Sequence, residues 1–326
     1  MRVPITLSLH IPNFNYPDVG PDEVFERVAA IAATAEASGF SSVSVMDHLH
    51  QIAPVGPPTN WMFEGSTMLA AIAARTTRLT MGLMVGSVTY RNPALAAKIT
   101  TTLDLISGGR VWHGIGAGWF EAEHVAYGYR FPSLRTRLEM LEDELQIVRA
   151  MFTAEAARFD GRHLRVAGAY NNPKPLRGDI PILVGGSGER KTLRLVAKYG
   201  DGCNVFGDPA RVRYLLDVLE SHCADLGRDS SQITKTALGR VLIAPTHAAA
   251  EAKKLVLRER GVPQTSIDSM VAGDPDTVGE RVQEYRDAGL DGYCFSMSDS
   301  YDLETLALAG ATLSKVFPPA ASAVAA

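Results

Sequence analysis

Cysteine is scarce in this chain, and long apolar runs are missing. The three cysteines among its 326 residues, Cys203, Cys223 and Cys294, are widely separated and form no C-x-x-C pair. Isolated cysteines are typical of buried free thiols in a reducing compartment. No apolar segment approaches the roughly 20 residues that a membrane helix needs. We therefore expect a cytoplasmic protein that has no disulfide and does not bind membranes.

Clusters of basic residues are missing as well. The chain has 36 acidic and 32 basic residues, which gives a formal net charge of −4. Because nucleic acids attract clustered cations, this balance argues against a nucleic-acid partner. Apolar residues make up 46% of the chain, enough for one large core. This length is typical of a single α/β barrel, so we expect one domain over residues 1–326, with a loose tail at 318–326.

The most informative stretch runs from Ser107 to His124. An apolar segment beginning at Val111 acquires glycines at positions 114, 116 and 118 and then becomes acidic. Glycines at alternate positions leave one face of a strand open to a flat ligand, or let neighbouring chain pack closely, and both interpretations stay open. Positions 119 and 121 hold Trp and Glu, so the stretch has no G-x-G-x-x-G dinucleotide motif, and it has no P-loop ending.

Strand and helix patterns alternate along the chain. Apolar runs predict eight strands, at residues 5–11, 42–46, 79–89, 181–184, 203–206, 238–244 and 292–297 and in the glycine-rich stretch. Helical periodicity falls between them, at residues 22–39, 67–75, 93–107, 134–152, 189–199, 209–226, 248–260 and 277–288 and from 303 onward. Residues 158–172 are typical of an inserted hairpin. This order predicts a (β/α)8 TIM barrel, and a doubly wound sheet is the alternative.

Several blocks of the sequence resemble one known family. The chain is similar to the bacterial-luciferase-like superfamily and, within it, to the oxidoreductases that depend on the deazaflavin coenzyme F420. The matching blocks are residues 45–48, 90–98, 103–110, 114–119 with Glu123, 173–176, and 182–188 continuing to 202. They span most of the chain in the family's order. The resemblance implies a luciferase-like TIM barrel, with FMN as the alternative cofactor.

A glycine-rich turn at residues 185–188 is the candidate phosphate site. A flexible turn ahead of a helix offers unpaired N–H groups and the positive end of the helix dipole to an anion. The alternative is an ordinary helix cap made by the serine of this turn. The resemblance places the cofactor phosphate here, on Gly185, Gly186, Ser187 and Gly188.

The resemblance also locates the cofactor ring. It implies that the ring lies in the barrel mouth, between the end of the 79–89 strand and the glycine-rich backbone. Members of this branch carry a cis peptide bond before a residue other than proline at that strand end, which the alignment of blocks puts near 84–85. The residues expected to contact the cofactor in this region are Asp47, Met84, Val85, Gly86, Gly116, Ala117 and Gly118.

His48 is the candidate for proton transfer. It follows a predicted strand, at the end where barrel enzymes place their active sites, and histidine titrates near physiological pH. A buried structural histidine is the alternative, but the resemblance implies a histidine at this place. His50 completes an H-x-H pair, half of a metal site, yet no histidine occurs in 181–188 or 203–208. We therefore expect no metal, and a metal-dependent hydrolase is the alternative from another class.

The substrate pocket is expected to include Asn13, His50, Trp119 and Glu123. Sugar-phosphate dehydrogenases of the family carry a carboxylate where this chain has Trp119, which favours an apolar or aromatic substrate. Glu123 is also compatible with a simple role beside a helix dipole. The expected activity is F420-dependent hydride transfer, by C=C or C=N reduction or alcohol oxidation, in a homodimer. An FMN-dependent monooxygenase is the alternative.

Overall fold

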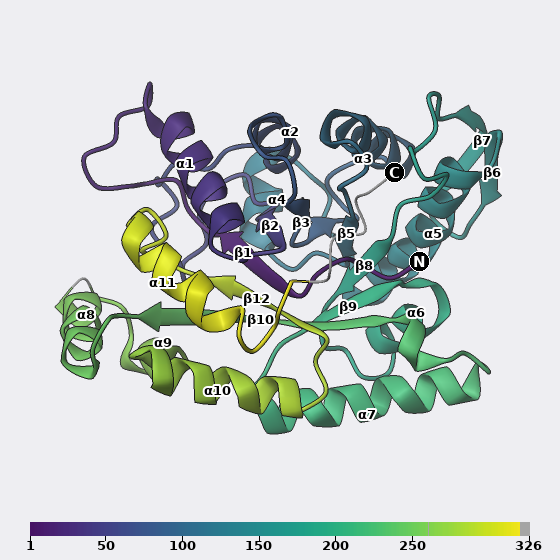
Figure 1. The fold of residues 1–326 in the computed structure, drawn as a ribbon. Helices are drawn as coiled ribbons and strands as arrows, with labels where there is room; N and C mark the ends of the chain where they lie inside the picture. The colour runs from purple at the N-terminus through teal and green to yellow at the C-terminus, as the bar shows by residue number, and fades with distance from the viewer. Residues whose placement is uncertain (260, 320–326) are drawn as a thin grey trace.

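The computed structural model describes residues 1–259 and 261–319. A parallel sheet curls into a barrel, with strands in the order β3-β2-β1-β12-β10-β9-β8-β5-β4 (Figure 1). Its strands are β1 (Leu7–Ile11), β2 (Ser42–Val45), β3 (Thr80–Leu83), β4 (Gly86–Ser87), β5 (His113–Gly116), β8 (Ile182–Gly185), β9 (Gly202–Val205), β10 (Thr234–Ile243) and β12 (Gly292–Ser296). A short strand, β11 (Val271–Gly273), pairs with β10 outside this path.

The barrel closes between β3, β4 and β5. The two short strands β3 and β4 replace the single strand predicted at 79–89, and a cis peptide bond, Met84–Val85, lies between them. Gly86 in β4 pairs with Ile115 in β5, and Met81 in β3 bridges to Val111. Counted together, β3 and β4 form one position of an eight-position barrel. The predicted barrel and the predicted cis peptide are both confirmed.

Helices cover the outside of the barrel (Figure 1). They are α1 (Val24–Ala37), α2 (Gly65–Arg75), α3 (Pro93–Ser107), α5 (Leu134–Thr153), α6 (Thr192–Tyr199), α7 (Pro209–Asp225), α10 (Pro275–Asp287) and α11 (Leu303–Leu313). Apolar residues spaced three or four apart bury one face of each, as α1 does with Val24, Val28, Ile31 and Ala35. Most barrel strands are buried along their whole length, because helices cover one face and the barrel interior the other.

Some elements differ from the sequence prediction. The helix expected at 189–199 begins only at Thr192, because the preceding residues extend the glycine-rich turn. Strand β10 begins at Thr234, four residues before the predicted start. The hydroxyls of its buried threonines donate hydrogen bonds to the backbone oxygens of Val3 (2.9 Å) and Cys203 (2.6 Å), so these polar residues fit in the core. Helices α4 (Glu121–Tyr127), α8 (His247–Glu259) and α9 (Gln264–Asp268) follow β5 and β10, and α4, α9 and β11 were not predicted.

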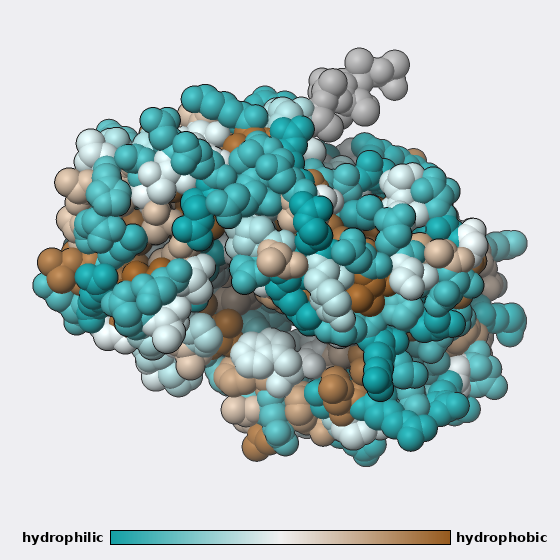
Figure 2. Space-filling view, turned by 90° about the horizontal axis from the view of Figure 1, so that it is seen from below, coloured by the Kyte–Doolittle hydropathy of each residue, from teal (hydrophilic) through white to brown (hydrophobic). Residues whose placement is uncertain are grey.

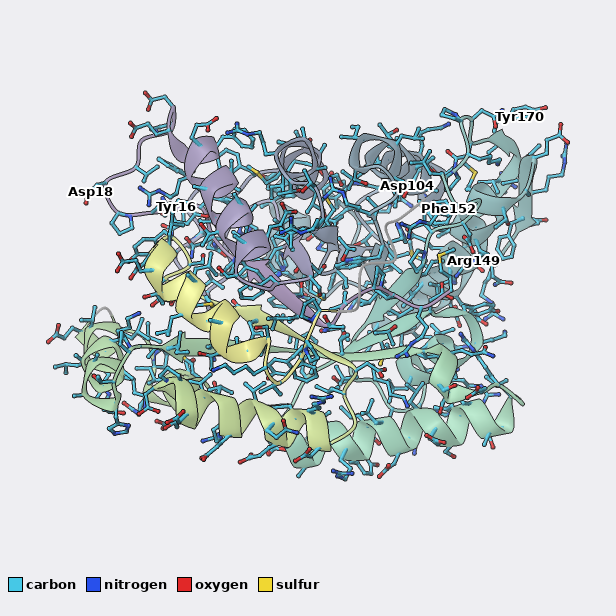
Figure 3. The ribbon with its side chains drawn as sticks, in the orientation of Figure 1. Tyr16, Asp18, Asp104, Arg149, Phe152 and Tyr170 are labelled. Atoms are coloured by element: carbon cyan, nitrogen blue, oxygen red, sulfur yellow. The ribbon has the colours of Figure 1, made fainter. Side chains whose placement is uncertain are left out.

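A hairpin lies at the periphery of the barrel. The predicted hairpin is present as β6 (Ala156–Asp160) and β7 (Arg165–Tyr170), with Tyr170 at its outer edge (Figure 3).

On the face shown in Figure 2, apolar side chains form small spots separated by hydrophilic ones. None of the described helices has the length and hydropathy needed to cross a bilayer. Most of the predicted tail, residues 320–326, lies outside the described residues.

Arg110 connects helices α2 and α3 to the segment that leads into β3. Its buried guanidinium donates to the backbone oxygens of Ala73 (2.9 Å), Thr76 (2.9 Å), Leu79 (2.7 Å) and Ser107 (2.6 Å). These oxygens belong to the last turn of α2, the approach to β3 and the last residue of α3. Carbonyls at helix ends lack partners within the helix, so one side chain satisfies three chain segments at once.

Candidate active site

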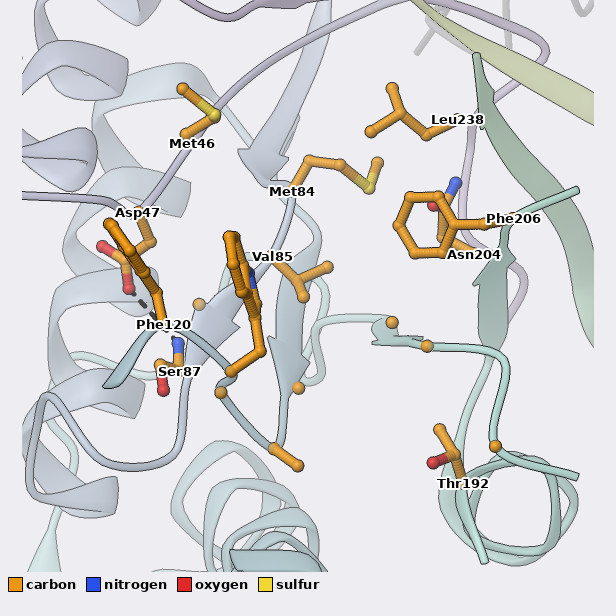
Figure 4. A pocket seen from close by; sticks show the side chains of 18 of the residues that line it. Met46, Asp47, Met84, Val85, Ser87, Phe120, Thr192, Asn204, Phe206 and Leu238 are labelled. Atoms are coloured by element: carbon orange, nitrogen blue, oxygen red, sulfur yellow. Dashed lines mark hydrogen bonds between the residues drawn. The ribbon is translucent and has the colours of Figure 1, made fainter. Parts of the chain in front are cut away.

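A cavity of about 710 Å³ opens at the carboxyl ends of the barrel strands (Figure 4). Parallel strands all present these ends on the same side, so residues distant in sequence converge there. Met46 and Asp47 follow β2, Asn204 comes from β9, and Leu238 comes from β10. Its walls are mostly apolar, and Thr192 at the start of α6 lies across the cavity from Asp47.

Val85 forms the back wall of this cavity, in the space that two glycines leave. A Cβ atom at Gly116 would lie 3.0 Å from the nearest Val85 methyl carbon, and one at Gly185 only 2.7 Å from it. At Gly114 a Cβ would come within 2.0 Å of the Leu83 carbonyl oxygen. The glycine pattern therefore serves close packing of chain on chain, and that packing projects the Val85 side chain into the cavity.

Asp47 anchors β4 beneath the cavity. Its carboxylate accepts two hydrogen bonds from Arg91, at 2.6 and 2.8 Å, and one from the Ser87 N–H at 3.3 Å. Burial raises the pKa of Asp47, against the opposing pull of Arg91. The two parallel bonds are the geometry of a bidentate ion pair. Asp47 thus fixes the short β4 segment that follows Val85.

His48 is held by a buried carboxylate. Its Nδ1 lies 3.0 Å from Oε2 of Glu123, a residue with no solvent exposure. Glu123 also accepts hydrogen bonds from the Tyr90 hydroxyl and from the N–H groups of Leu49 (2.5 Å) and His50 (3.0 Å). Burial alone would raise the pKa of Glu123, but these bonds, with that from His48 the strongest, hold it at about 2.

The ionised state of Glu123 settles the tautomer of His48. A carboxylate can only accept hydrogen bonds, so the proton of a neutral His48 ring must lie on Nδ1. Nε2 is then the nitrogen available to a ligand in the cavity. The rings of Trp119 and Phe120 pack nearly perpendicular to the imidazole, with centroids 5.5 and 5.7 Å away. His48 is therefore oriented on several sides.

Residues 187–191 form the turn before α6. Their five backbone N–H groups make no hydrogen bond with any other described residue. The Ser187 hydroxyl accepts from the Phe206 N–H (2.9 Å), so it braces the turn against β9 and does not cap the helix. Free N–H groups beside a helix start are the arrangement that binds phosphate. Arg190 and Lys191 line the cavity at the same place.

His10 and Asn204 are two of the cavity residues that the sequence did not indicate; the others are Met46, Ile52, Ser87, Tyr90, Phe120, Leu134, Leu138, Glu189, Thr192, Phe206 and Leu238. His10 is the second-last residue of β1. Its Nδ1 lies 3.0 Å from the Ser44 hydroxyl, and burial and nearby His48 lower its pKa to about 4. Its place at a strand end could have identified it. Asn204 donates to Thr236 (3.0 Å), while its buried side-chain oxygen has no partner among the described residues. No sequence signal distinguished Asn204.

Most of the predicted site residues line this cavity. They are Asp47, His48, Met84, Val85, Gly86, Gly116, Ala117, Gly118, Trp119, Gly185, Gly186 and Gly188. Four lie elsewhere: Ser187 braces the turn, Glu123 is buried behind His48, the His50 ring packs on Phe120 and Tyr127, and Asn13 lines a second cavity. Within residues 1–259 and 261–319, no group of three or more His, Cys, Asp or Glu side chains could hold a metal ion.

Known proteins share this sequence pattern and this architecture. A model of the luciferase-like monooxygenase family matches residues 5–262. The F420-dependent glucose-6-phosphate dehydrogenase of Nocardia farcinica is 28% identical over 318 residues, which cover 85% of this chain and 88% of that protein.

Two solved structures resemble the barrel closely. The coenzyme F420-dependent tetrahydromethanopterin reductase of Methanopyrus kandleri gives a TM-score of 0.78 at 19% identity, over 96% of this chain and 99% of that one. A riboflavin lyase with modified FMN gives 0.79 at 18% identity, over 99% of this chain and 94% of that one. At these identities the two likenesses show the fold alone.

Proposed function

The chain belongs to the luciferase-like monooxygenase family, and from that premise we propose that it is an F420-dependent oxidoreductase that transfers a hydride to or from a small apolar or aromatic substrate. The observation that carries this proposal is the His48–Glu123 pair. It presents one imidazole nitrogen to an apolar cavity large enough for a tricyclic cofactor ring and a small substrate. Relatives that are named for F420 dependence support the choice of cofactor.

The residues around the cavity fit such a cofactor. Val85 offers a flat apolar wall for a ring, with Met84 beside it. The free N–H groups of residues 187–191, together with Arg190, offer donors and positive charge for a phosphate. The predicted contacts at Asp47, Gly86, Gly116, Ala117, Gly118, Gly185, Gly186, Ser187 and Gly188 stay predictions.

The chemistry divides between cofactor and protein. F420, when bound, supplies or accepts the hydride. His48 moves the proton: Nε2 of the neutral ring accepts one from an alcohol, and the protonated ring donates one to a reduced C=C or C=N bond. Glu123 touches no substrate and acts as a positioning residue, because it holds Nδ1 and stabilises the positive ring. Phe120 and Trp119 pack against the His48 ring and help to hold its orientation.

The substrate is expected to be apolar or aromatic. Trp119 and Phe120 stack with ring centroids 5.0 Å apart at the cavity rim. Neither side chain can pair with a sugar hydroxyl as a carboxylate would. Of the two carboxylates that follow Trp119, Glu121 is exposed and does not line the cavity. Glu123 accepts hydrogen bonds from four donors behind His48 and is closed to substrate.

Cofactor titration tests this proposal. Adding the purified protein to F420 should change the fluorescence of the deazaflavin saturably, while FMN should bind much more weakly. Reduced F420 should then be oxidised by an activated alkene such as cyclohexenone, anaerobically. Tight FMN binding with oxygen-dependent turnover, and no response from F420, would instead establish the FMN-dependent monooxygenase, which the family name and the flavin-bound structural neighbour favour.

We also propose a cytoplasmic homodimer. Leu255 and Val256 of α8 are 51% and 42% exposed, and neighbouring apolar side chains of this kind are typical of a subunit contact. Sedimentation equilibrium measures the assembly directly. A monomer at micromolar concentration would contradict the proposal.

A further inference from the structure

A second cavity, of about 730 Å³, adjoins the cofactor cavity. Two segments line both cavities with neighbouring residues. At the end of β1, His10 lines the first cavity and Pro12 the second, and in the loop after β2 Ile52 lines the first cavity and Ala53 the second. The two spaces therefore share a wall only one or two residues thick.

Strand β10 also contributes residues to both cavities, and its course gives the direction from one cavity to the other. Leu238 lines the cofactor cavity and Arg240 lines the second cavity. Side chains two residues apart on a strand point to the same side, about 7 Å apart along it. An elongated molecule can thus lie along β10, with one end beside Leu238 and the other at Arg240.

Arg240 carries the one charge among the described residues that line the second cavity. One terminal nitrogen of its guanidinium donates to the Ser269 hydroxyl at 2.8 Å, and no described carboxylate pairs with it. Burial lowers the pKa of Arg240. Arginine nevertheless stays protonated in proteins, so a half-buried cation without a counter-ion faces the cavity.

Two further polar groups in the lining are unsatisfied. The Tyr16 hydroxyl and the Asn13 side-chain oxygen are buried and have no hydrogen-bond partner among the described residues. Tyr16, in the loop after β1 (Figure 3), is only 7% exposed. Burial raises the pKa of Tyr16, so its hydroxyl keeps its proton and can donate. A buried polar group without a partner is costly, and a ligand that pairs with it recovers that cost.

We propose that the second cavity binds the carboxylate end of an elongated substrate. Arg240 pairs with the carboxylate, and the Tyr16 hydroxyl lies in the same lining as a further donor. The apolar, reducible part of the same molecule lies beside Leu238 in the cofactor cavity, which His48 also lines. A single cation matches a singly charged carboxylate better than a doubly charged phosphate. The inference rests on the proposed function and narrows its substrates to unsaturated or carbonyl-containing carboxylic acids.

A matched pair of probes tests the subsite without any turnover. Binding of 3-phenylpropanoate and of its methyl ester to the cofactor-free protein is measured by ligand-observed NMR. The acid should bind about tenfold more tightly than the ester, because a charge-assisted hydrogen bond is lost in the ester. Arg240→Gln should abolish this preference, and Arg240→Lys should keep part of it. Arg281→Gln, at an exposed position on α10, is the matched control and should keep it all.

Two outcomes would contradict the carboxylate subsite. Equal binding of acid and ester by the wild type, or an acid preference that survives in Arg240→Gln, overturns the subsite. F420 affinity, measured in parallel, shows that the Arg240→Gln variant is folded. If F420 fails to bind the wild type while the acid preference depends on Arg240, the proposed function fails and the subsite stands.

Discussion

His48 and Glu123 have different parts in the proposed mechanism. Glu123 was expected among the substrate contacts, but the structure buries it and surrounds it with four donors. A carboxylate with a pKa of about 2 stays charged throughout the working range of an enzyme. Glu123 therefore orients His48 from a buried position that is closed to the cavity.

A double-mutant cycle tests these different parts. His48→Ala should lower turnover by about 10²- to 10⁴-fold, as loss of a general acid–base group does, and should leave F420 affinity nearly unchanged. Glu123→Gln should lower turnover less and shift the pH profile. If Glu123 acts through His48, the double variant should be no slower than His48→Ala. Losses that multiply in the double variant would show that Glu123 has an independent role.

Arg110 gives the turn between α3 and β5 a structural role. Gly108 and Gly109 end α3 with φ angles of +69° and +84°, which returns the chain toward β5 and brings Arg110 under α2. The sequence identified the glycines and the arginine as a family block. It gave no indication of the four carbonyls that the guanidinium joins.

Arg110→Lys should therefore destabilise the fold despite keeping the charge. A lysine has one nitrogen and cannot reach four carbonyls on three segments, so some of them are left buried without a donor. We expect the free energy of unfolding to fall by about 2 to 4 kcal/mol in urea titrations. Arg281→Lys, at an exposed position on α10, should change it by less than about 0.5 kcal/mol. Equal stability of the two variants would refute this structural role of Arg110.

Phosphate binding at the turn before α6 can be tested without replacing a glycine that has a positive φ angle. Gly186 has a φ of +125°, so a larger residue there would perturb the turn whether or not it binds phosphate. Thr192→Val removes one hydroxyl from the cavity wall and keeps the shape. F420 affinity should fall about tenfold, because hydrogen bonds to charged groups contribute about 1.5 to 3 kcal/mol. Thr102→Val, exposed on α3, should bind F420 normally; equal affinities would place the phosphate elsewhere.

One buried acid, Glu144, makes the stability of the folded protein depend on pH. Glu144 in α5 is 1% exposed, and its Oε2 has no partner among the described residues. Burial raises its pKa to about 8 from an ordinary value of 4.5. The folded state therefore holds a proton that the unfolded state releases between these two values. Its contribution to stability is complete below about pH 4.5 and is lost as the pH rises through about 8.

Glu144→Gln should remove this dependence, because glutamine has the shape of the protonated acid. Between about pH 5 and 8 the wild type should lose up to about 1.4 kcal/mol of stability per pH unit relative to the variant. Urea unfolding of both proteins across this range measures the difference. Glu284→Gln, on the outer face of α10, should run parallel to the wild type. Parallel curves for Glu144→Gln as well would show that Glu144 is not buried as a neutral acid.

Much of this architecture could be predicted from the sequence, and the reasons for success and failure are physical. Periodic apolar residues marked the barrel strands and their helices, because burial on one face imposes that period. The seven-residue helix α4 was missed, since so short a segment carries little period. The partnership of His48 with Glu123 joins residues 75 positions apart, and no local pattern reports it. The second cavity likewise arises between loops that meet only in the folded chain.

Trp119 also has an optical consequence. Of the three indoles, Trp112 is fully buried, whereas Trp119 lines the cofactor cavity and is 60% exposed at its rim. A ring system that absorbs near-ultraviolet light, placed against Val85, would lie within energy-transfer range of this indole. Its arrival should therefore dim tryptophan emission without any label. Trp119 is thus a built-in fluorescent reporter at the rim of the cofactor cavity.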